Sequence, residues 1–160
     1  MIDLRSLNIG CGESSFCTDR IDIRKTSTTT LVCDVENGLP FPDNTFFLVY
    51  SKNNLEHLAN VGFHLKECLR VLRPGGKICL RTDNASCWRF YVFGTHTGKY
   101  EKLHSGDHHF CIFTKSHLKN HFEQAGFRDI NIFYVKTDTL GKWLDLFTFQ
   151  HPRIRVVAHK

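Results

Sequence analysis

Short apolar runs separated by turn-forming segments mark the first half of the chain. These runs predict buried strands over 4–9, 20–23, 28–33, 45–50 and 77–81. Between the last two runs, apolar residues recur at helical spacing: Val61, Leu65, Cys68, Leu69 and Leu72. This spacing predicts an amphipathic helix of about three turns. Arg73-Pro74-Gly75-Gly76 then ends the helix and turns the chain.

The second half of the chain has an irregular segment followed by three regular elements. Between residues 83 and 115 no periodic pattern holds, although aromatic residues and histidines are frequent there. Ser116 predicts a helix N-cap, and the helix ends at Gly126. Strands follow over 127–135 and 154–158. The order β-β-β-β-α-β-α-β-β predicts a single α/β domain over 1–160 with one mostly parallel sheet.

A glycine-rich turn follows the first strand. Gly10 and Gly12 flank Cys11, and their missing side chains let the backbone bend and bring its N–H groups close to a ligand. In an open α/β sheet, ligands bind beyond the carboxyl ends of the strands, where this turn lies. Gly-x-Gly also occurs in ordinary turns, so the motif alone leaves both interpretations open.

Composition restricts the class of protein. With 160 residues, 41% hydrophobic and 23% charged, the chain is typical of one soluble globular domain. No apolar run approaches the roughly 18 residues that span a bilayer, and no secretion signal is visible. We therefore expect a cytoplasmic protein without a membrane segment. The formal net charge of +5 permits an acidic partner, but the basic residues are spread along the chain and do not indicate a nucleic-acid surface.

The chain has seven cysteines, and none forms a C-x-x-C pair. Their odd number and irregular spacing favour buried thiols in a reducing compartment, with Cys33 and Cys79 inside strands and Cys68 on a helix face. A zinc site is the alternative for a group of cysteines and histidines: Cys87, His104, His108, His109 and Cys111. No pair among them has the usual ligand spacing, so we expect no metal site.

Three motifs follow one another in a specific order. They are the glycine turn at 7–12, Leu39-Pro40-Phe41-Pro42-Asp43-Asn44-Thr45-Phe46, and Leu55-Glu56-His57-Leu58 leading to 70–76. Together they resemble the class I S-adenosylmethionine-dependent methyltransferases, in particular the methyltransferase type 11-like group. The resemblance covers most of residues 5–82. It implies a Rossmann-like three-layer sandwich with a mostly parallel seven-stranded sheet whose last strand is antiparallel.

The resemblance also implies where S-adenosyl-L-methionine, the family's cofactor, would bind. Backbone groups of Gly10, Cys11 and Gly12 would wrap its methionine part, and Ser51 would lie near its amino-acid end. Asn8 stands where the family most often has an acidic residue. It can still hydrogen-bond the loop, but it carries no charge to attract a sulfonium.

Two aspartates complete the cofactor site that the resemblance implies. Asp22 would accept hydrogen bonds from the ribose hydroxyls. Asp34 would accept one from the adenine amine, with Ile23 and Val35 against the ring. The alternative interpretation for each aspartate is a helix cap or a solvated turn.

The sequence starts almost at the first strand, so we expect the N-terminal helices that usually cover the site in this family to be missing. The site would then be open, or covered by the acceptor-side segment 83–115, by a second copy in a homodimer, or by a helper protein.

Methyl transfer from a sulfonium uses an activated donor. The protein mainly aligns the acceptor with the methyl group, and in some cases it removes a proton. The candidate bases are His57, Asp83, His96, His108 and His109. His57 follows the fourth strand closely, although packing or capping would also explain it.

The acceptor is only partly constrained. Ser51-Lys52-Asn53-Asn54 replaces the Asn-Pro-Pro-Tyr type of motif that serves planar nitrogen acceptors, and no Pro-Cys motif suggests pyrimidine methylation. The aromatic residues at 88–91 would either stack on a planar acceptor or simply pack. We expect a small molecule or a sugar; RNA or protein, with a helper subunit, is the alternative.

Two other function classes are compatible with parts of the sequence to different degrees. A nicotinamide dehydrogenase would need a third glycine where Ser15 stands, and its acidic residue would come roughly 20 residues after the loop rather than about ten. A non-catalytic S-adenosylmethionine-binding partner subunit fits the small size and the lack of an evident catalytic dyad. Turnover of the cofactor distinguishes this module from an enzyme.

Overall fold

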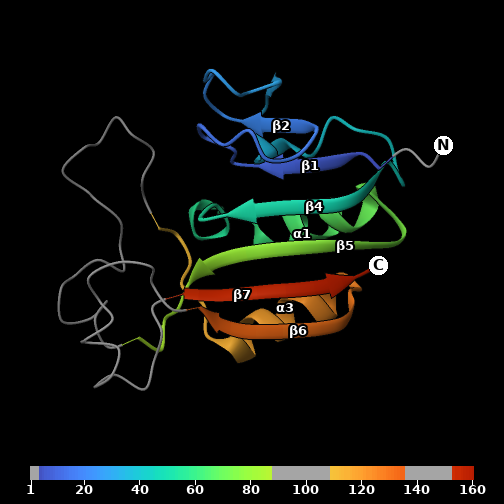
Figure 1. Ribbon diagram of the computed structural model, residues 1–160. Coiled ribbons are helices and arrows are strands. Elements are labelled where there is room, and N and C mark those ends of the chain that lie inside the picture. Colours follow the sequence, from blue (N-terminus) through green and yellow to red (C-terminus); the bar gives the residue numbers. More distant parts are fainter. Residues whose placement is uncertain (1–3, 88–108, 136–152) are drawn as a thin grey trace, which may run out of the picture.

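One seven-stranded sheet organises the molecule in a computed structural model that describes residues 4–87, 109–135 and 153–160 (Figure 1). The strand order is β3-β2-β1-β4-β5-β7-β6. The strands are β1 (Ser6–Ile9), β2 (Asp19–Asp22), β3 (Leu31–Val32), β4 (Phe46–Lys52), β5 (Leu72–Asp83), β6 (Arg128–Val135) and β7 (Arg153–His159). The first five pair in parallel, and β7 is antiparallel to both of its neighbours. The expected Rossmann-like sheet with its antiparallel last strand is confirmed.

The two described α-helices pack on the same face of this sheet (Figure 1). They are α1 (Val61–Val71) and α3 (Lys115–Ala125); two short 3-10 helices, η1 (Val35–Asn37) and η2 (Leu55–His57), flank the carboxyl ends of the strands. In the described ranges the opposite face carries no helix, so the third layer of the sandwich is not built from α-helices there. No helix among the described residues has both the length and the apolar character needed to cross a membrane.

The hydrophobic core lies between the sheet and these two helices. Along the strands, residues on the helix side are fully buried, as at Val49, Ile78 and Val156, because alternate side chains point to opposite faces. Their neighbours Tyr50 and Cys79 point to the other face and are only partly buried. The core therefore fills one side of the sheet and leaves the carboxyl ends of the strands free for a site.

Helix α1 begins where the apolar pattern predicted, but it ends at Val71, so Leu72 lies in β5 and not in the helix. The side chain of Asn60 caps its first turn by accepting a hydrogen bond from the amide of Phe63 (3.1 Å), and Leu65 and Cys68 are fully buried. Strand β5 begins at Leu72 and not at 77 as predicted, so residues 73–76, predicted as a turn, belong to the strand; the pairing of β4 with β5 shifts register there.

The predicted N-cap of α3 is wrong by two residues. Thr114, not Ser116, caps the helix by accepting a hydrogen bond from the amide of His117 (3.3 Å). Phe113 forms a β-bridge with Asn84, which holds the preceding backbone extended and starts the helix earlier. The predicted stop at Gly126 is confirmed.

The strand predicted over 28–33 is mostly wrong as well. Only Leu31 and Val32 pair with β2. The threonines before them use their hydroxyl groups to bond the glycine loop and one another, which competes with ladder pairing. Cys33 consequently lies just outside the strand and is half-buried, and Cys79 is half-buried on the helix-free face; Cys68 is buried as expected.

Candidate active site

The glycine loop lies at the carboxyl end of β1, as predicted, and its first glycine is sterically required. Gly10 and Gly12 both have left-handed backbones, with φ of +66° and +51°. A Cβ atom on Gly10 would lie 2.7 Å from Oδ1 of Asn54, closer than nonbonded atoms can approach. Space around Gly12 is open. The loop therefore packs directly against the segment that follows β4.

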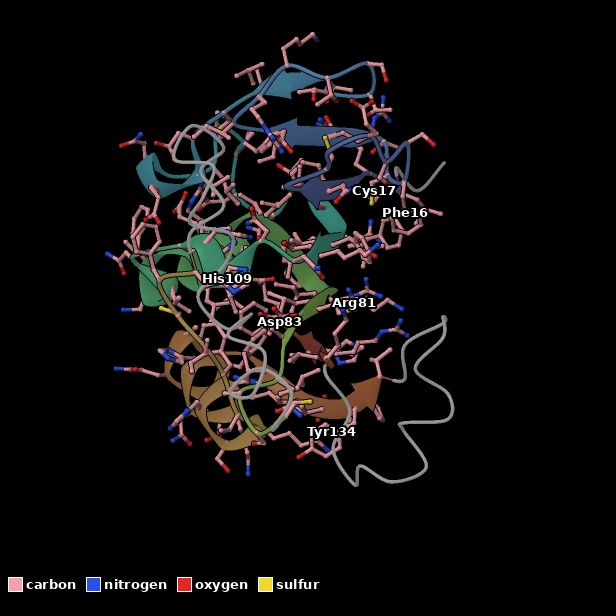
Figure 2. All side chains as sticks on the ribbon, turned by 90° about the vertical axis from the view of Figure 1, so that its left-hand side faces the viewer. Phe16, Cys17, Arg81, Asp83, His109 and Tyr134 are labelled. Atoms are coloured by element: carbon pink, nitrogen blue, oxygen red, sulfur yellow. The ribbon has the colours of Figure 1, made fainter. Side chains whose placement is uncertain are left out.

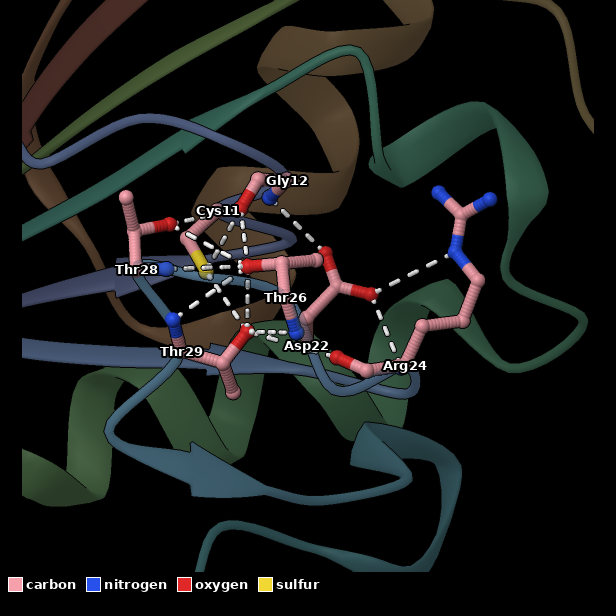
Figure 3. A network of polar contacts seen from close by, with 7 residues as sticks. All are labelled: Cys11, Gly12, Asp22, Arg24, Thr26, Thr28 and Thr29. Atoms are coloured by element: carbon pink, nitrogen blue, oxygen red, sulfur yellow. Dashed lines mark hydrogen bonds and ion pairs between the residues drawn. The ribbon is translucent and has the colours of Figure 1, made fainter.

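Hydrogen bonds hold the peptide groups of Gly12 from both sides (Figure 3). Its N–H donates to Oδ2 of Asp22 (2.9 Å), while its carbonyl accepts from the hydroxyls of Thr26 (2.7 Å) and Thr28 (2.8 Å). Thr26 also bonds Thr29 (2.8 Å). These bonds fix the loop in a single conformation before any ligand binds, which lowers the entropic cost of binding one.

Asp22 is nearly buried at the end of β2, with 7% of its surface exposed. Besides the Gly12 bond, its Oδ1 accepts from the backbone N–H of Arg24 (3.0 Å), and the guanidinium Nε of Arg24 lies 3.8 Å away. A carboxylate has about four acceptor positions, so both oxygens keep capacity for ligand hydroxyls. The turn-forming role and the predicted ribose-binding role are therefore compatible.

Asp34 also combines a structural and a candidate binding position. It is the N-cap of η1, where Oδ1 accepts from the amide of Glu36 (3.0 Å) and Oδ2 from the side chain of Asn37 (3.1 Å). The helix-cap interpretation of this residue is confirmed. Asp34 nevertheless faces the same cavity as Asp22.

This cavity has a volume of about 510 Å³ and lies beyond the carboxyl ends of β1, β2 and β4. Six of the predicted cofactor residues line it: Gly10, Gly12, Asp22, Ile23, Asp34 and Val35. Arg24, Cys33, Glu36, Asn53, Asn54, His57 and Leu58 complete the lining.

Three predicted residues lie behind the cavity wall. Ser51 is buried and donates its hydroxyl to the carbonyl of Ile9 (3.2 Å). Asn8 donates to the carbonyl of Phe16 (3.3 Å), and the Cys11 thiol lies 3.7 Å from the Thr29 hydroxyl. Their side chains support the loop from behind.

Asn53 and Asn54 were missed as site residues. In the sequence they served only to exclude a planar-nitrogen motif. Two amide side chains directly after a buried strand are a polar signal at the ligand-binding edge of the sheet, and that signal was available. Asn53 moreover has a left-handed backbone, with φ of 53°, which re-aims the chain toward the glycine loop.

Three of the candidate bases come together, and one of them, His57, lines the cavity. His57 is the last residue of η2. Asp83 ends β5, and His109 starts the second described range (Figure 2). The rings of His57 and His109 meet edge to face with centroids 4.8 Å apart, and Oδ2 of Asp83 lies 3.8 Å from Nδ1 of His109. His96 and His108 lie outside the described residues.

Backbone bonds explain this convergence. The carbonyl of Glu56 accepts from the amides of Phe110 (2.8 Å) and Cys111 (3.2 Å), which fastens the second range against η2. The amide of Ala85 bonds the carbonyl of Phe113 (2.8 Å) and ties the same range to the end of β5. His109 is thereby held between His57 and Asp83.

Glu56 is a fourth member of this group that the sequence analysis did not select. Its carboxylate is 1% exposed and accepts a hydrogen bond from the hydroxyl of Thr82 (2.7 Å). Burial raises the pKa of Glu56, and burial also raises the pKa of Asp83, against which His109 and Arg153 act to lower it. The buried carboxyl of Glu56 and the partly buried carboxyl of Asp83 lie beside two imidazoles and form a polar centre next to the cavity.

Known proteins share this sheet and its motifs. Residues 7–80 match the family described as a methyltransferase domain. The chain is 31% identical over 110 residues to the demethylmenaquinone methyltransferase of Lactiplantibacillus plantarum, covering 58% of this chain and 46% of that protein. It is 32% identical over 84 residues to the ubiquinone biosynthesis O-methyltransferase of Nitrobacter winogradskyi, covering 51% and 32%. The chain thus spans less than half the length of these relatives.

A solved structure shares the whole fold. The S-adenosylmethionine-dependent methyltransferase of Thermotoga maritima, described as a possible histamine N-methyltransferase, superposes with a TM-score of 0.76 at 13% identity and covers all of this chain and 84% of that one. The matching residues 7–80 contain the glycine loop, both cavity aspartates and His57. Residues 7–80 are thus similar to a methyltransferase domain, and the fold is similar to that of a solved S-adenosylmethionine-dependent methyltransferase.

Proposed function

We propose that this chain transfers the methyl group of S-adenosylmethionine to a small-molecule acceptor. One observation carries the proposal: the fixed glycine loop and the carboxylates of Asp22 and Asp34 line the same cavity as His57. The residues that we propose to bind the cofactor therefore line the same cavity as His57, which belongs to the polar centre.

The cavity suggests how the cofactor lies. Its methionine part fits beside the backbone of Gly10 and Gly12, its ribose hydroxyls next to Asp22, and its adenine against Val35 with the amine near Asp34. This places the sulfonium methyl group toward His57. The residues present thus fit the cofactor of the family.

The names of the relatives favour a small acceptor. The proteins from Lactiplantibacillus plantarum and Nitrobacter winogradskyi are named for demethylmenaquinone and for ubiquinone biosynthesis, so quinone-type compounds are the first acceptors to test, followed by sugars. Transfer to RNA or protein with a helper subunit is the alternative.

Methyl transfer depends more on aligning the acceptor atom with the methyl group than on activating either reactant. The acceptor atom must lie in line with the methyl carbon and the sulfur, in a space that excludes water. We assign acceptor binding to the end of the cavity where His57, His109 and Asp83 meet, because these are the described groups able to exchange a proton or hold a polar acceptor there.

Cofactor binding is tested by calorimetric titration of S-adenosylmethionine and S-adenosylhomocysteine into the wild-type protein and the Asp22→Ala and Asp34→Ala variants. We expect each variant to weaken binding at least tenfold, or about 1.4 kcal/mol. Asp43→Ala is the matched control, since Asp43 is exposed and lies away from the cavity. Equal affinity in all four proteins would refute the assigned site.

Turnover is tested by incubating the protein with S-adenosylmethionine and panels of phenolic quinone precursors and sugars, then measuring S-adenosylhomocysteine. Acceptor-dependent product is the expected result. Binding without product in every panel, including one with RNA and cell protein, would instead favour the non-catalytic module.

A further inference from the structure

The polar centre beside the cavity has the composition of a metal site. Glu56, His57 and His109 each offer one ligand atom, and these three atoms all lie within 4.8 Å of one another. Two imidazoles and one carboxylate are the ligand set of many zinc and non-haem iron(II) sites. The sequence did not reveal this set, because His109 lies 52 positions after His57.

The surroundings of the three residues resemble the support that metal ligands need. Asp83 lies 3.8 Å from Nδ1 of His109, where a carboxylate can orient the ring. The hydroxyl of Thr82 donates to Oε2 of Glu56 (2.7 Å) and fixes that carboxylate. The Glu56 carbonyl holds the backbone that carries His109 in place. Glu56 and His109 are therefore each supported by an identified neighbour.

The position of Glu56, His57 and His109 is typical of a catalytic metal site and not of a structural one. Glu56 is fully buried, whereas His57 lines the cofactor cavity and the side chain of His109 is 11% exposed. An ion held here would have protein ligands on its inner side and an open position toward the cavity. Catalytic metal sites have this arrangement, whereas structural sites are closed.

We propose that Glu56, His57 and His109 bind one divalent transition-metal ion, and that this ion holds an oxygen-bearing acceptor next to the cofactor. Metal–ligand bonds of about 2.1 Å require the three ligand atoms to approach one another by about 1 Å, which side-chain rotation supplies. The role of the ion in catalysis rests on the proposed function; the binding of the ion does not.

The proposed step is balanced without a further reactant. A hydroxyl of the acceptor binds the ion, becomes more acidic and releases its proton to water. Its oxygen then forms a bond to the methyl carbon as the carbon–sulfur bond breaks. The electron pair of that bond stays on sulfur, which gives S-adenosylhomocysteine and the methyl ether. The site thus favours phenols, enols and vicinal diols over amines.

The ion is tested with the full chain, stripped with a chelator and titrated with Co²⁺ as a spectroscopic probe and with Zn²⁺ by calorimetry. We expect one ion per chain and visible cobalt bands without the near-ultraviolet absorption of cobalt–thiolate bonds. The second criterion excludes the seven free cysteines as the source of binding.

Variants locate the ion. His57→Ala and His109→Ala should each weaken binding at least 100-fold, and Asp83→Asn, which changes only the supporting carboxylate, about tenfold. Glu56→Gln keeps an acceptor for Thr82, so it tests the ligand without removing that bond. His117→Ala, on the exposed side of α3, is the matched control and should bind like the wild type. Circular dichroism confirms that each variant is folded.

The outcomes separate the two proposals. No ion bound by the wild-type protein, or binding that survives both histidine variants, overturns the metal site. If the ion binds but S-adenosylmethionine does not, the metal site stands and the proposed function fails. If the cofactor binds but no ion does, only the metal site fails.

Discussion

Gly10 and Gly12 share a left-handed backbone but differ in the space around them, which gives a matched pair of variants. Gly10→Ala would add a strained backbone and a clash with Asn54, and we expect it to lower the free energy of unfolding by about 2–3 kcal/mol. Gly12→Ala adds only the strain, or about 1 kcal/mol. Urea unfolding measures both. Equal losses would show that the Asn54 contact is unimportant.

His64 makes stability depend on pH. Its side chain is buried on α1, where its Nε2 lies 3.5 Å from the thiol of Cys68, and burial lowers the pKa of His64 from 6.5 to about 4. The unfolded chain takes up a proton near pH 6.5 while the folded chain does not. The contribution of this neutral histidine is complete above pH 6.5 and is lost as pH falls toward 4, up to about 3 kcal/mol.

Urea unfolding of the wild type and of His64→Leu at pH 7 and pH 4.5 checks this pH dependence. The variant should lose less stability between the two values, because it cannot take up this proton. His117→Leu, at an exposed position, should keep the wild-type loss. A His64→Leu variant as pH-sensitive as the wild type would contradict the assignment.

The sequence predicted individual site residues, but it did not predict which of them lie side by side in the fold. His57, Asp83 and His109 were each predicted as separate candidates, but long-range backbone bonds, such as those from Phe110 and Cys111 to the Glu56 carbonyl, bring them together. Those bonds join backbones about 55 positions apart, and no local pattern encodes them.

At the scale of an element, α1 does more than fill the core: its last turns fasten the loop before β4. Glu67 accepts from the amide of Leu39 (2.8 Å). The hydrogen bond from Arg70 lowers the pKa of Glu67, against burial, which raises it. Arg70 donates to the carbonyls of Leu39 (2.9 Å) and Phe41 (2.8 Å). This explains why the loop motif and the helix motif occur together in the sequence.

Arg70→Met should therefore lower the free energy of unfolding by about 2–3 kcal/mol, since it leaves two carbonyls and Glu67 without their donor. Lys119→Met removes an exposed ion pair with Glu123 on α3 and should cost less than about 0.5 kcal/mol. Urea unfolding compares the two. A loss in Arg70→Met as small as in Lys119→Met would show that the loop is held by other contacts.

Elements with one strong pattern were predicted well, and those with competing interactions were not. The apolar spacing of α1 and the runs of β4 and β5 gave correct elements, because burial decides their structure. The threonine-rich segment before Leu31 has high strand propensity, yet its hydroxyls bond the Gly12 carbonyl instead. Hydrogen bonds to Gly12, some 15 positions earlier, therefore override the strand propensity of this segment.

At the scale of the whole molecule, one core joins the two halves of the sheet. Buried residues of β1 and β4 on one side and of β7 on the other belong to the same cluster as those of both helices. A ligand that binds beyond β1, β2 and β4 should therefore stabilise β7 as well, although it does not touch it.

Amide hydrogen exchange measures this coupling. S-adenosylhomocysteine at 100 times its Kd should raise the free energy of unfolding by about 2.7 kcal/mol, and the slowest amides of β1 and β7 should be protected equally. Protection limited to β1 would mean that the halves unfold separately.

The position of β7 has a consequence for synthesis. Although β7 is the last described strand in the sequence, it lies inside the sheet, where it pairs with β5 over Lys77–Asp83 and with β6 over Arg128–Val135. As the chain emerges from the ribosome, β1 to β5 can assemble in order, but β6 has no neighbour until Arg153–His159 has been translated. Until then two strand edges remain open, and nascent chains at this stage are the ones that need a chaperone.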